Sequence, residues 1–167
     1  MDFVNKETRS RMMSAVHSKD TKLETDIRRR LFAMGFRYRL HRRDLPGTPD
    51  LVFPKYAAVI FVHGCFWHSH GCERSKLPET RARWWKNKIN SNRSRDKISI
   101  DKLRKMNLRV MIIWECSVRF PGKDRTEMLQ TVAERASLFL QSEKALIQVP
   151  RFPHKRADIR AREKKNV

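Results

Sequence analysis

The sequence predicts an α/β domain in which a mixed central sheet is flanked by helices. Short apolar runs of strand length alternate with longer segments of helical periodicity, in the order helix, strand, hairpin, long helix, strand, helix. The 167 residues include 5 Gly and 7 Pro and show no internal repeat, which favours one compact unit over two domains. We therefore expect residues 1–149 to form a single domain.

The N-terminal part of the chain predicts an arm, a helix and a strand. Residues 1–19 are polar and indicate an arm that leads into the first helix. Residues 21–34 place apolar side chains on one helical face, and Gly35 follows as a stop signal. Residues 36–41 alternate apolar and basic side chains, which is typical of a half-buried strand.

The middle of the chain predicts a hairpin and then an irregular loop. Two apolar runs, residues 50–53 and 57–63, are separated by Pro54-Lys55-Tyr56, a turn signal that favours a β-hairpin. Residues 64–77 are rich in Cys, His and aromatic side chains, and their pattern fits neither a strand nor a helix.

The C-terminal half predicts a long helix, a buried strand and another helix. The long helix spans about residues 78–106, with Ser91 as a candidate break, and residues 108–114 form an apolar strand buried on both faces. A capping-box pattern begins the next helix at Asp124, and this helix ends near Gln141. Residues 150–167 predict a mobile basic tail.

Charge is the most unusual property of the composition. The chain carries 38 Lys+Arg against 18 Asp+Glu, a formal net charge of +20, and a nucleic-acid partner explains this excess. A solvated cationic surface and a membrane surface are the alternatives. Residues 81–97 interleave basic side chains with Trp84 and Trp85, which suits phosphate contact and base stacking. No apolar run is long enough to span a membrane and residues 1–20 lack a signal-peptide core, so we expect a soluble, intracellular protein.

The cysteines suggest a structural zinc site. Cys65, His70 and Cys72 form a C-x4-H-x-C run, and Cys116 follows the predicted strand of residues 108–114. Three thiolates and one imidazole match a closed tetrahedral zinc set. The alternative is three unrelated free cysteines, and the use of every cysteine of the chain favours zinc.

Two aromatic side chains, Phe66 and Trp67, lie between the first and second of these ligands. They either fill the domain core, as most aromatic residues do, or protrude as a wedge between base pairs. The sequence leaves both readings open.

A carboxylate and two histidines outline a candidate active site. Asp50 begins a predicted strand, where a carboxylate is exposed at the end of a sheet and can bind Mg²⁺. His63 and His68 are not needed for zinc and can serve as acid or base near a phosphate. The alternatives are an ordinary turn Asp and structural histidines. Glu24 can reach this site, although the pattern Thr21-x-x-Glu24 favours a local capping role.

Four motifs follow one another along the chain: ETRSRMMSAV at residues 7–16, PGTPD at 46–50, FVHGCFWHSHGC at 61–72 and VMIIWEC at 110–116. Together they closely resemble the very short patch repair endonucleases, the Vsr family, over about residues 7–140. The resemblance implies a restriction-endonuclease-like fold of the PD-(D/E)XK type with a structural zinc site. The acidic-x-Lys signature of that fold is absent after the PD strand, and His63 and His68 would supply the substitute chemistry.

The resemblance also implies a magnesium-dependent active site. Asp50 resembles the carboxylate that binds Mg²⁺, helped by the backbone carbonyl of Val62, where the best-known member has a threonine. His68 resembles the base that activates water. Glu24 and His63 match residues that support the metal-bound waters and the leaving group.

Zinc and DNA contacts are implied in the same way. The residues that match the zinc ligands are Cys65, His70, Cys72 and Cys116. The residues that match the intercalating wedge are Met13, Phe66 and Trp67. The residues that match the DNA-contacting helix are Trp85 and Asn92, and residues 1–19 are expected to form a DNA-contacting arm.

The leading hypothesis is a strand-specific, Mg²⁺-dependent endonuclease that nicks 5′ to the mispaired T of T·G mismatches, which arise when 5-methylcytosine deaminates. The alternatives are a zinc-stabilised DNA-binding module without catalysis and a nicking nuclease of other specificity. The family implies a monomer in the bacterial cytoplasm, associated with the nucleoid. Its substrate is mismatched double-stranded DNA, and mismatch-repair proteins and a cytosine-5 methyltransferase system are candidate partners.

Overall fold

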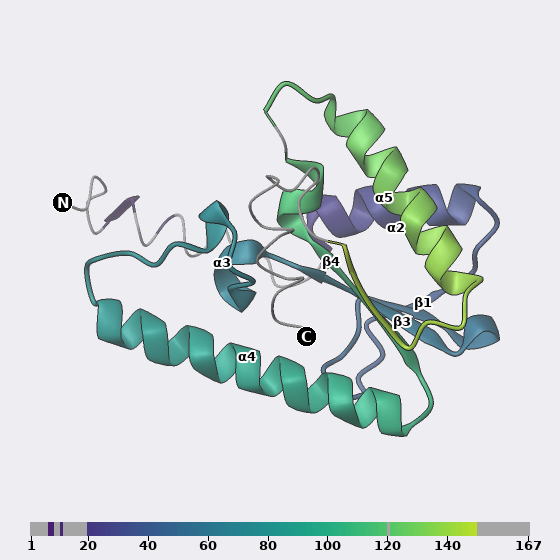
Figure 1. The fold of residues 1–167 in the computed structure, drawn as a ribbon, viewed down its shortest axis with the longest axis horizontal. Coiled ribbons are helices and arrows are strands. Elements are labelled where there is room, and N and C mark those ends of the chain that lie inside the picture. The colour runs from purple at the N-terminus through teal and green to yellow at the C-terminus, as the bar shows by residue number, and fades with distance from the viewer. Residues whose placement is uncertain (1–6, 9–10, 12–19, 120, 150–167) are drawn as a thin grey trace, which may run out of the picture.

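The computed structural model describes residues 7–8, 11, 20–119 and 121–149. Its centre is a five-stranded sheet with the strand order β1-β2-β3-β4-β5 (Figure 1). β1, β2 and β3 pair antiparallel, whereas β3, β4 and β5 pair parallel, which confirms the predicted mixed sheet. The strands are β1 (Arg39–Leu40), β2 (Leu51–Phe53), β3 (Ala58–His63), β4 (Arg109–Trp114) and β5 (Leu146–Val149).

The helices are α2 (Lys22–Ala33), α3 (Cys65–His68), α4 (Ala82–Lys105) and α5 (Arg125–Leu140). Side chains cap two of them as the sequence predicts. Thr21 accepts a hydrogen bond from the N–H of Glu24 at the start of α2, and Asp124 accepts one from the N–H of Glu127 at the start of α5. Both helices therefore begin where the capping motifs place them.

The helices cover the sheet on both faces (Figure 1). Since successive side chains of a strand point to opposite faces, the strands contribute to two separate buried clusters. One cluster joins α2 and α5 to Ile60 and Met111. The other joins the C-terminal half of α4, through Leu103, to Val59 and Val110.

Two expectations for the N-terminal half differ from the structure, one in the length of a strand and one in the structure of a loop. The strand expected over residues 36–41 is only two residues long, because Phe36 turns into the core and packs edge-on against Phe53. The segment 64–77, expected to be irregular, contains the single helical turn α3 and a 3₁₀ turn at Glu73–Ser75. Elements this short are below one or two helical periods, so periodicity does not reveal them.

Two further differences lie in the C-terminal half. α4 begins only at Ala82 and continues through Ser91 without a break, because Ile89 and Leu103 belong to one continuous buried face and Ser91 points to solvent. The edge strand β5 was not predicted, and its first residue, Leu146, is 39% exposed. A short edge strand with little burial leaves a weak sequence pattern.

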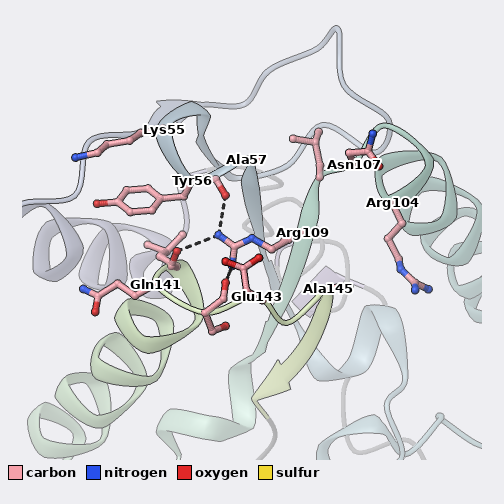
Figure 2. Close-up of a pocket in the computed structure, with 12 residues that line it drawn as sticks. Lys55, Tyr56, Ala57, Arg104, Asn107, Arg109, Gln141, Glu143 and Ala145 are labelled. Carbon is pink, nitrogen blue, oxygen red and sulfur yellow. Dashed lines mark hydrogen bonds between the residues drawn. The ribbon is translucent and has the colours of Figure 1, made fainter.

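At the opposite end of the sheet from the predicted site, β3 and β4 begin beside a pocket lined by Lys55, Arg104 and Arg109 (Figure 2). The guanidinium of Arg109 donates hydrogen bonds to backbone carbonyls near the end of α5 and before β3. The acceptors are Tyr56 at 2.6 Å, Phe139 at 2.7 Å, Leu140 at 2.9 Å and Ser142. Because the last carbonyls of a helix lack partners within it, Arg109 has a structural role here.

The tail of residues 150–167 and most of the arm of residues 1–19 lie outside the described residues. None of the described helices has the length and apolar character that crossing a bilayer requires.

Candidate metal and catalytic centre

The predicted site residues meet at one edge of the sheet. Asp50 directly precedes β2, and His63 is the last residue of β3. Because β2 runs antiparallel to β3, the start of one strand lies beside the end of the other. β4 runs parallel to β3, so its end, followed by Cys116, lies at the same edge. The site thus combines residues that the chain supplies far apart.

Asp50 is the acidic group at this edge. The backbone N–H of Val62 donates a hydrogen bond of 2.7 Å to its Oδ2. Burial raises the pKa of Asp50 to about 6, the Val62 hydrogen bond opposes this rise, and the negative charge of Glu24 adds to it. A carboxylate destabilised in this way fits a site that receives a cation, and its hard oxygen donors suit Mg²⁺.

Val62 lies on β3 where its backbone can contribute a further donor. The N–H and C=O of one strand residue leave the strand on the same side. Since the N–H of Val62 donates to Asp50, the carbonyl of Val62 also points to the side of β3 on which Asp50 lies. This arrangement suits the backbone role expected of Val62 and does not involve its side chain.

Glu24 forms the capping interaction and also lies near Asp50. Its carboxylate accepts hydrogen bonds of 2.9 Å from the N–H of Asp20 and from the hydroxyl of Thr21, so the capping interaction is confirmed. Glu24 is nevertheless only 4% exposed, and its charge raises the pKa of Asp50. The capping bonds therefore hold a buried carboxylate next to the site.

His63 and His68, the two predicted site histidines outside the zinc set, lie against each other. The rings of His63 and His68 are stacked, with centroids 3.8 Å apart. Burial, followed by the neighbouring His68, lowers the pKa of His63 to about 3, so His63 is neutral at physiological pH. Among the described residues, the buried Nδ1 of His63 has no hydrogen-bond partner.

Asp96 of α4 is a site residue that the sequence analysis missed. Its Oδ2 lies 2.6 Å from Nδ1 of His68. A carboxylate can only accept, so Nδ1 of His68 is the donor in this contact, and in a neutral imidazole Nε2 is then the nitrogen with the lone pair. The available signal was that Asp96 is the lone acid in the basic stretch 81–97.

His41 is the other residue that the sequence analysis missed. It follows β1, and its Nδ1 lies 3.9 Å from Oδ1 of Asp50. The sequence offered a weak signal, because a histidine in an arginine-rich loop resembles part of a cationic surface.

The four predicted zinc ligands form one cluster. One ligand atom from each of Cys65, His70, Cys72 and Cys116 lies within 4.8 Å of the others. Nε2 of His70 is 3.0 Å from Sγ of Cys116, and the N–H of Cys116 donates to Sγ of Cys65 at 3.3 Å. A hydrogen bond with Cys116 and burial together raise the pKa of Cys65 to about 12. The raised pKa means that the thiolate form is disfavoured in the absence of a cation. A soft dication would stabilise the thiolates, because cysteines bind metal in that form.

The aromatic residues of α3 lie outside both buried clusters of the domain. Phe66 and Trp67 are half-buried, with ring centroids 5.1 Å apart, and both pack against Trp85 of α4 at 5.0 and 6.0 Å. This arrangement contradicts the core alternative and leaves the wedge alternative open. Met13, the remaining wedge residue, lies outside the described residues.

Asn92 has a structural contact in addition to its expected place on the DNA-contacting helix. It is 8% exposed, and its Nδ2 donates a 2.9 Å hydrogen bond to the carbonyl of Trp67. Asn92 therefore ties α3 to α4 and positions the aromatic pair. Around it, the exposed basic side chains of α4 include Arg83, Lys86, Lys88, Arg93, Arg95 and Lys97.

Comparison with known proteins adds an independent finding. The family model described as DNA mismatch endonuclease Vsr matches residues 1–74. The DNA mismatch endonuclease Vsr of Escherichia coli (strain K12) is 39% identical over 148 residues, covering 89% of this chain and 93% of that protein.

Other relatives carry the name of type II nicking enzymes, among them the following two. The type II nicking enzyme V.XorIIP of Xanthomonas oryzae pv. oryzae is 46% identical over 117 residues, 70% of this chain and 86% of that protein. The type II nicking enzyme V.NmeAIP of Neisseria meningitidis serogroup A is 37% identical over 133 residues, 80% of this chain and 95% of that protein.

Proposed function

This chain belongs to the Vsr family of DNA mismatch endonucleases, and we propose that it nicks one strand of a duplex 5′ to the mispaired T of a T·G mismatch. The observation that carries the proposal is the pair formed by His68 and Asp96, stacked on His63 next to Asp50. A module that only binds DNA has no need of a base oriented by a carboxylate. A phosphodiester hydrolase needs one.

Mg²⁺ belongs at Asp50 in this proposal. Asp50 would hold the ion through its carboxylate and Val62 through its backbone carbonyl, and buried Glu24 adds negative charge beside them. When bound, Mg²⁺ polarises the scissile phosphate and stabilises the charge that develops during hydrolysis. The raised pKa of Asp50 supports this assignment, because burial destabilises the charged carboxylate and a bound cation would offset that destabilisation.

His68 is the general base of the proposed reaction. Asp96 accepts the Nδ1 proton and holds the ring, so Nε2 is the nitrogen that takes a proton from the attacking water. As His68 becomes positively charged, the adjacent carboxylate of Asp96 stabilises the charge.

His63 acts as a neutral group beside the base. Its lowered pKa means that it does not compete with His68 for the proton. A neutral imidazole still donates one N–H, which suits contact with an oxygen of the phosphate or the leaving group. The stacking at 3.8 Å also limits how far the ring of His68 can turn.

Mismatch recognition is assigned to the aromatic pair on α3. Opening a base step costs a few kcal/mol and costs least where pairing is already poor, so an inserted wedge favours the mismatch. Phe66 and Trp67 begin the chain segment that ends at His70, and Cys65 precedes them. Zinc bound by Cys65, His70, Cys72 and Cys116 would therefore clamp both ends of the wedge and link it to the end of β4.

The decisive experiment uses end-labelled duplexes that differ in one pair: T·G, C·G or T·A. With Mg²⁺ we expect a nick 5′ to the T of the T·G duplex alone, and no nick when Mg²⁺ is withheld or Asp50 is replaced by Ala. Equal nicking of paired duplexes would indicate a nuclease of other specificity. Tight T·G binding without any nick would indicate a binding module.

A further inference from the structure

The loop after β1 brings one more side chain to Asp50. Leu40 pairs with Leu51, and the pairing continues for one residue, since the N–H of His41 approaches the carbonyl of Asp50 at 3.5 Å. His41 and Asp50 are therefore opposite one another at the end of the β1–β2 ladder. His41 has a φ of 44°, a left-handed conformation that is uncommon for a residue with a side chain.

The imidazole of His41 lies between two carboxylates. Its Nδ1 is 3.9 Å from Oδ1 of Asp50, and its Nε2 is 3.6 Å from Oδ1 of Asp20. Val62 occupies Oδ2 of Asp50, so His41 faces the other oxygen of that carboxylate. The side chain of His41 is 16% exposed, and its Nε2 is buried with no hydrogen-bond partner among the described residues.

These spacings are too long for direct hydrogen bonds and short enough for one intervening atom. Ligands bonded to one Mg²⁺ at 2.0–2.1 Å are separated by roughly 3–4 Å, and a water molecule bridges groups at slightly longer separations. The gap between His41 and Asp50 therefore has the size of an ion or an ion-bound water.

The surrounding contacts hold His41 in place rather than compete for it. Asp20, on the far side of the ring, receives a 2.5 Å hydrogen bond from Arg28, and Asp20 also donates its N–H to Glu24. Arg28 and Glu24 thus anchor Asp20 to α2, and Val62 anchors Asp50 to β3. Supporting groups of this kind orient metal ligands and their waters.

We propose that His41 is a further positioning residue of the cation site at Asp50, contacting the bound Mg²⁺ or one of its waters on the Oδ1 side. This inference rests on the proposed function, which places the ion at Asp50. It adds a nitrogen group from the β1 loop to a site otherwise made of oxygen donors. Removing such a supporting group typically weakens metal binding by 10- to 100-fold.

Metal binding can be measured directly with Mn²⁺, followed by its electron paramagnetic resonance signal, in the full zinc-loaded protein. A nicked product duplex is included because it cannot be cut again, and the duplex alone provides the background. The test variant is His41→Leu, which keeps side-chain volume without polar atoms. The reference variant is Asp50→Asn, and the control is Arg42→Ala, a neighbour whose side chain pairs with Asp44.

We expect His41→Leu to raise the Mn²⁺ dissociation constant about 10- to 100-fold, with Arg42→Ala unchanged and Asp50→Asn without specific binding. Nicking by His41→Leu should recover at saturating Mn²⁺, a recovery that a merely misfolded variant would not show. If the Leu variant fails to fold, His41→Ala carries the same test. A dissociation constant within twofold of wild type for His41→Leu, with binding lost in Asp50→Asn, would overturn the role of His41 alone. Unchanged binding in both variants would overturn the magnesium assignment itself.

Discussion

The rings of His63 and His68 are stacked face to face, with centroids 3.8 Å apart and planes 8° from parallel. Two imidazolium ions in this contact would repel each other, and burial keeps His63 neutral by lowering its pKa to about 3. The other ring of the pair, His68, is the one that Asp96 contacts, and it is the ring that we propose as the base.

Replacing His68 with Ala should lower the single-turnover nicking rate by about 10²–10⁴-fold, the usual contribution of a general base. Affinity for a T·G duplex without Mg²⁺ should stay near wild type, because the basic surface and the aromatic pair are retained. A rate within threefold of wild type would remove His68 from the mechanism.

Asp96→Asn tests the orientation of the base. An amide can donate to Nδ1 and stabilise the wrong tautomer, so we expect a loss of about 10²-fold or more in rate with DNA affinity preserved. Asp101→Asn is the matched control, because Asp101 is an exposed acid on the same helix. Equal rates for the two variants would show that Asp96 has no part in the reaction.

Asp50→Asn should stabilise the protein at neutral pH in the absence of Mg²⁺. The pKa of Asp50 is about 6 in the folded state and 3.8 when unperturbed, so folding disfavours the charged form. This shift corresponds to up to about 3 kcal/mol of destabilisation above pH 6, and the effect fades as the pH falls through 6 towards 4.

Urea unfolding of both proteins at pH 7.5 and pH 4.5 measures this difference. The gain from the Asn variant should shrink at the lower pH, and added Mg²⁺ should raise the melting temperature of the wild type alone. A variant that is less stable at pH 7.5 would mean that the Asp50 carboxylate is a structural group.

Cys116→Ser should release zinc and unfold or aggregate the protein, because Cys116 links α3 to the end of β4 and structural zinc supplies folding free energy. Metal analysis should find one zinc per chain in the wild type. Zinc-free protein that is fully folded and active would show that the four-residue cluster is not a metal site.

Trp67→Ala should lose preference for a T·G duplex over a paired one by roughly 1–3 kcal/mol, the scale of base–aromatic stacking. Because Trp67 is half-buried and lies outside the two core clusters, the melting temperature should change little. Phe32→Ala, at a 52% exposed aromatic residue of α2, serves as the control. A destabilised Trp67→Ala protein with unchanged mismatch preference would place recognition elsewhere, around Trp85.

Much of the fold could be predicted because it depends on local patterns. The caps at Thr21 and Asp124, the hairpin turn at Pro54 and the apolar run of β4 each act within a few residues, and the structure follows all of them. The zinc candidates were predictable for a different reason, since ligand chemistry restricts which residue types can serve. β5 was missed because it has only four residues, and only the last of them is fully buried.

The sequence by itself therefore determined the mixed α/β class and the strongly basic composition, and it singled out Asp50, His68 and the four-residue cysteine–histidine cluster as candidates. Tertiary structure alone decided which residues lie beside them. Asp96 reaches His68 across 28 positions of sequence, and His41 faces Asp50 only because β1 pairs with β2. Each neighbour has only a weak sequence signal, because a positioning group is defined by distance and direction, and the packing of α4 and the register of the sheet set both.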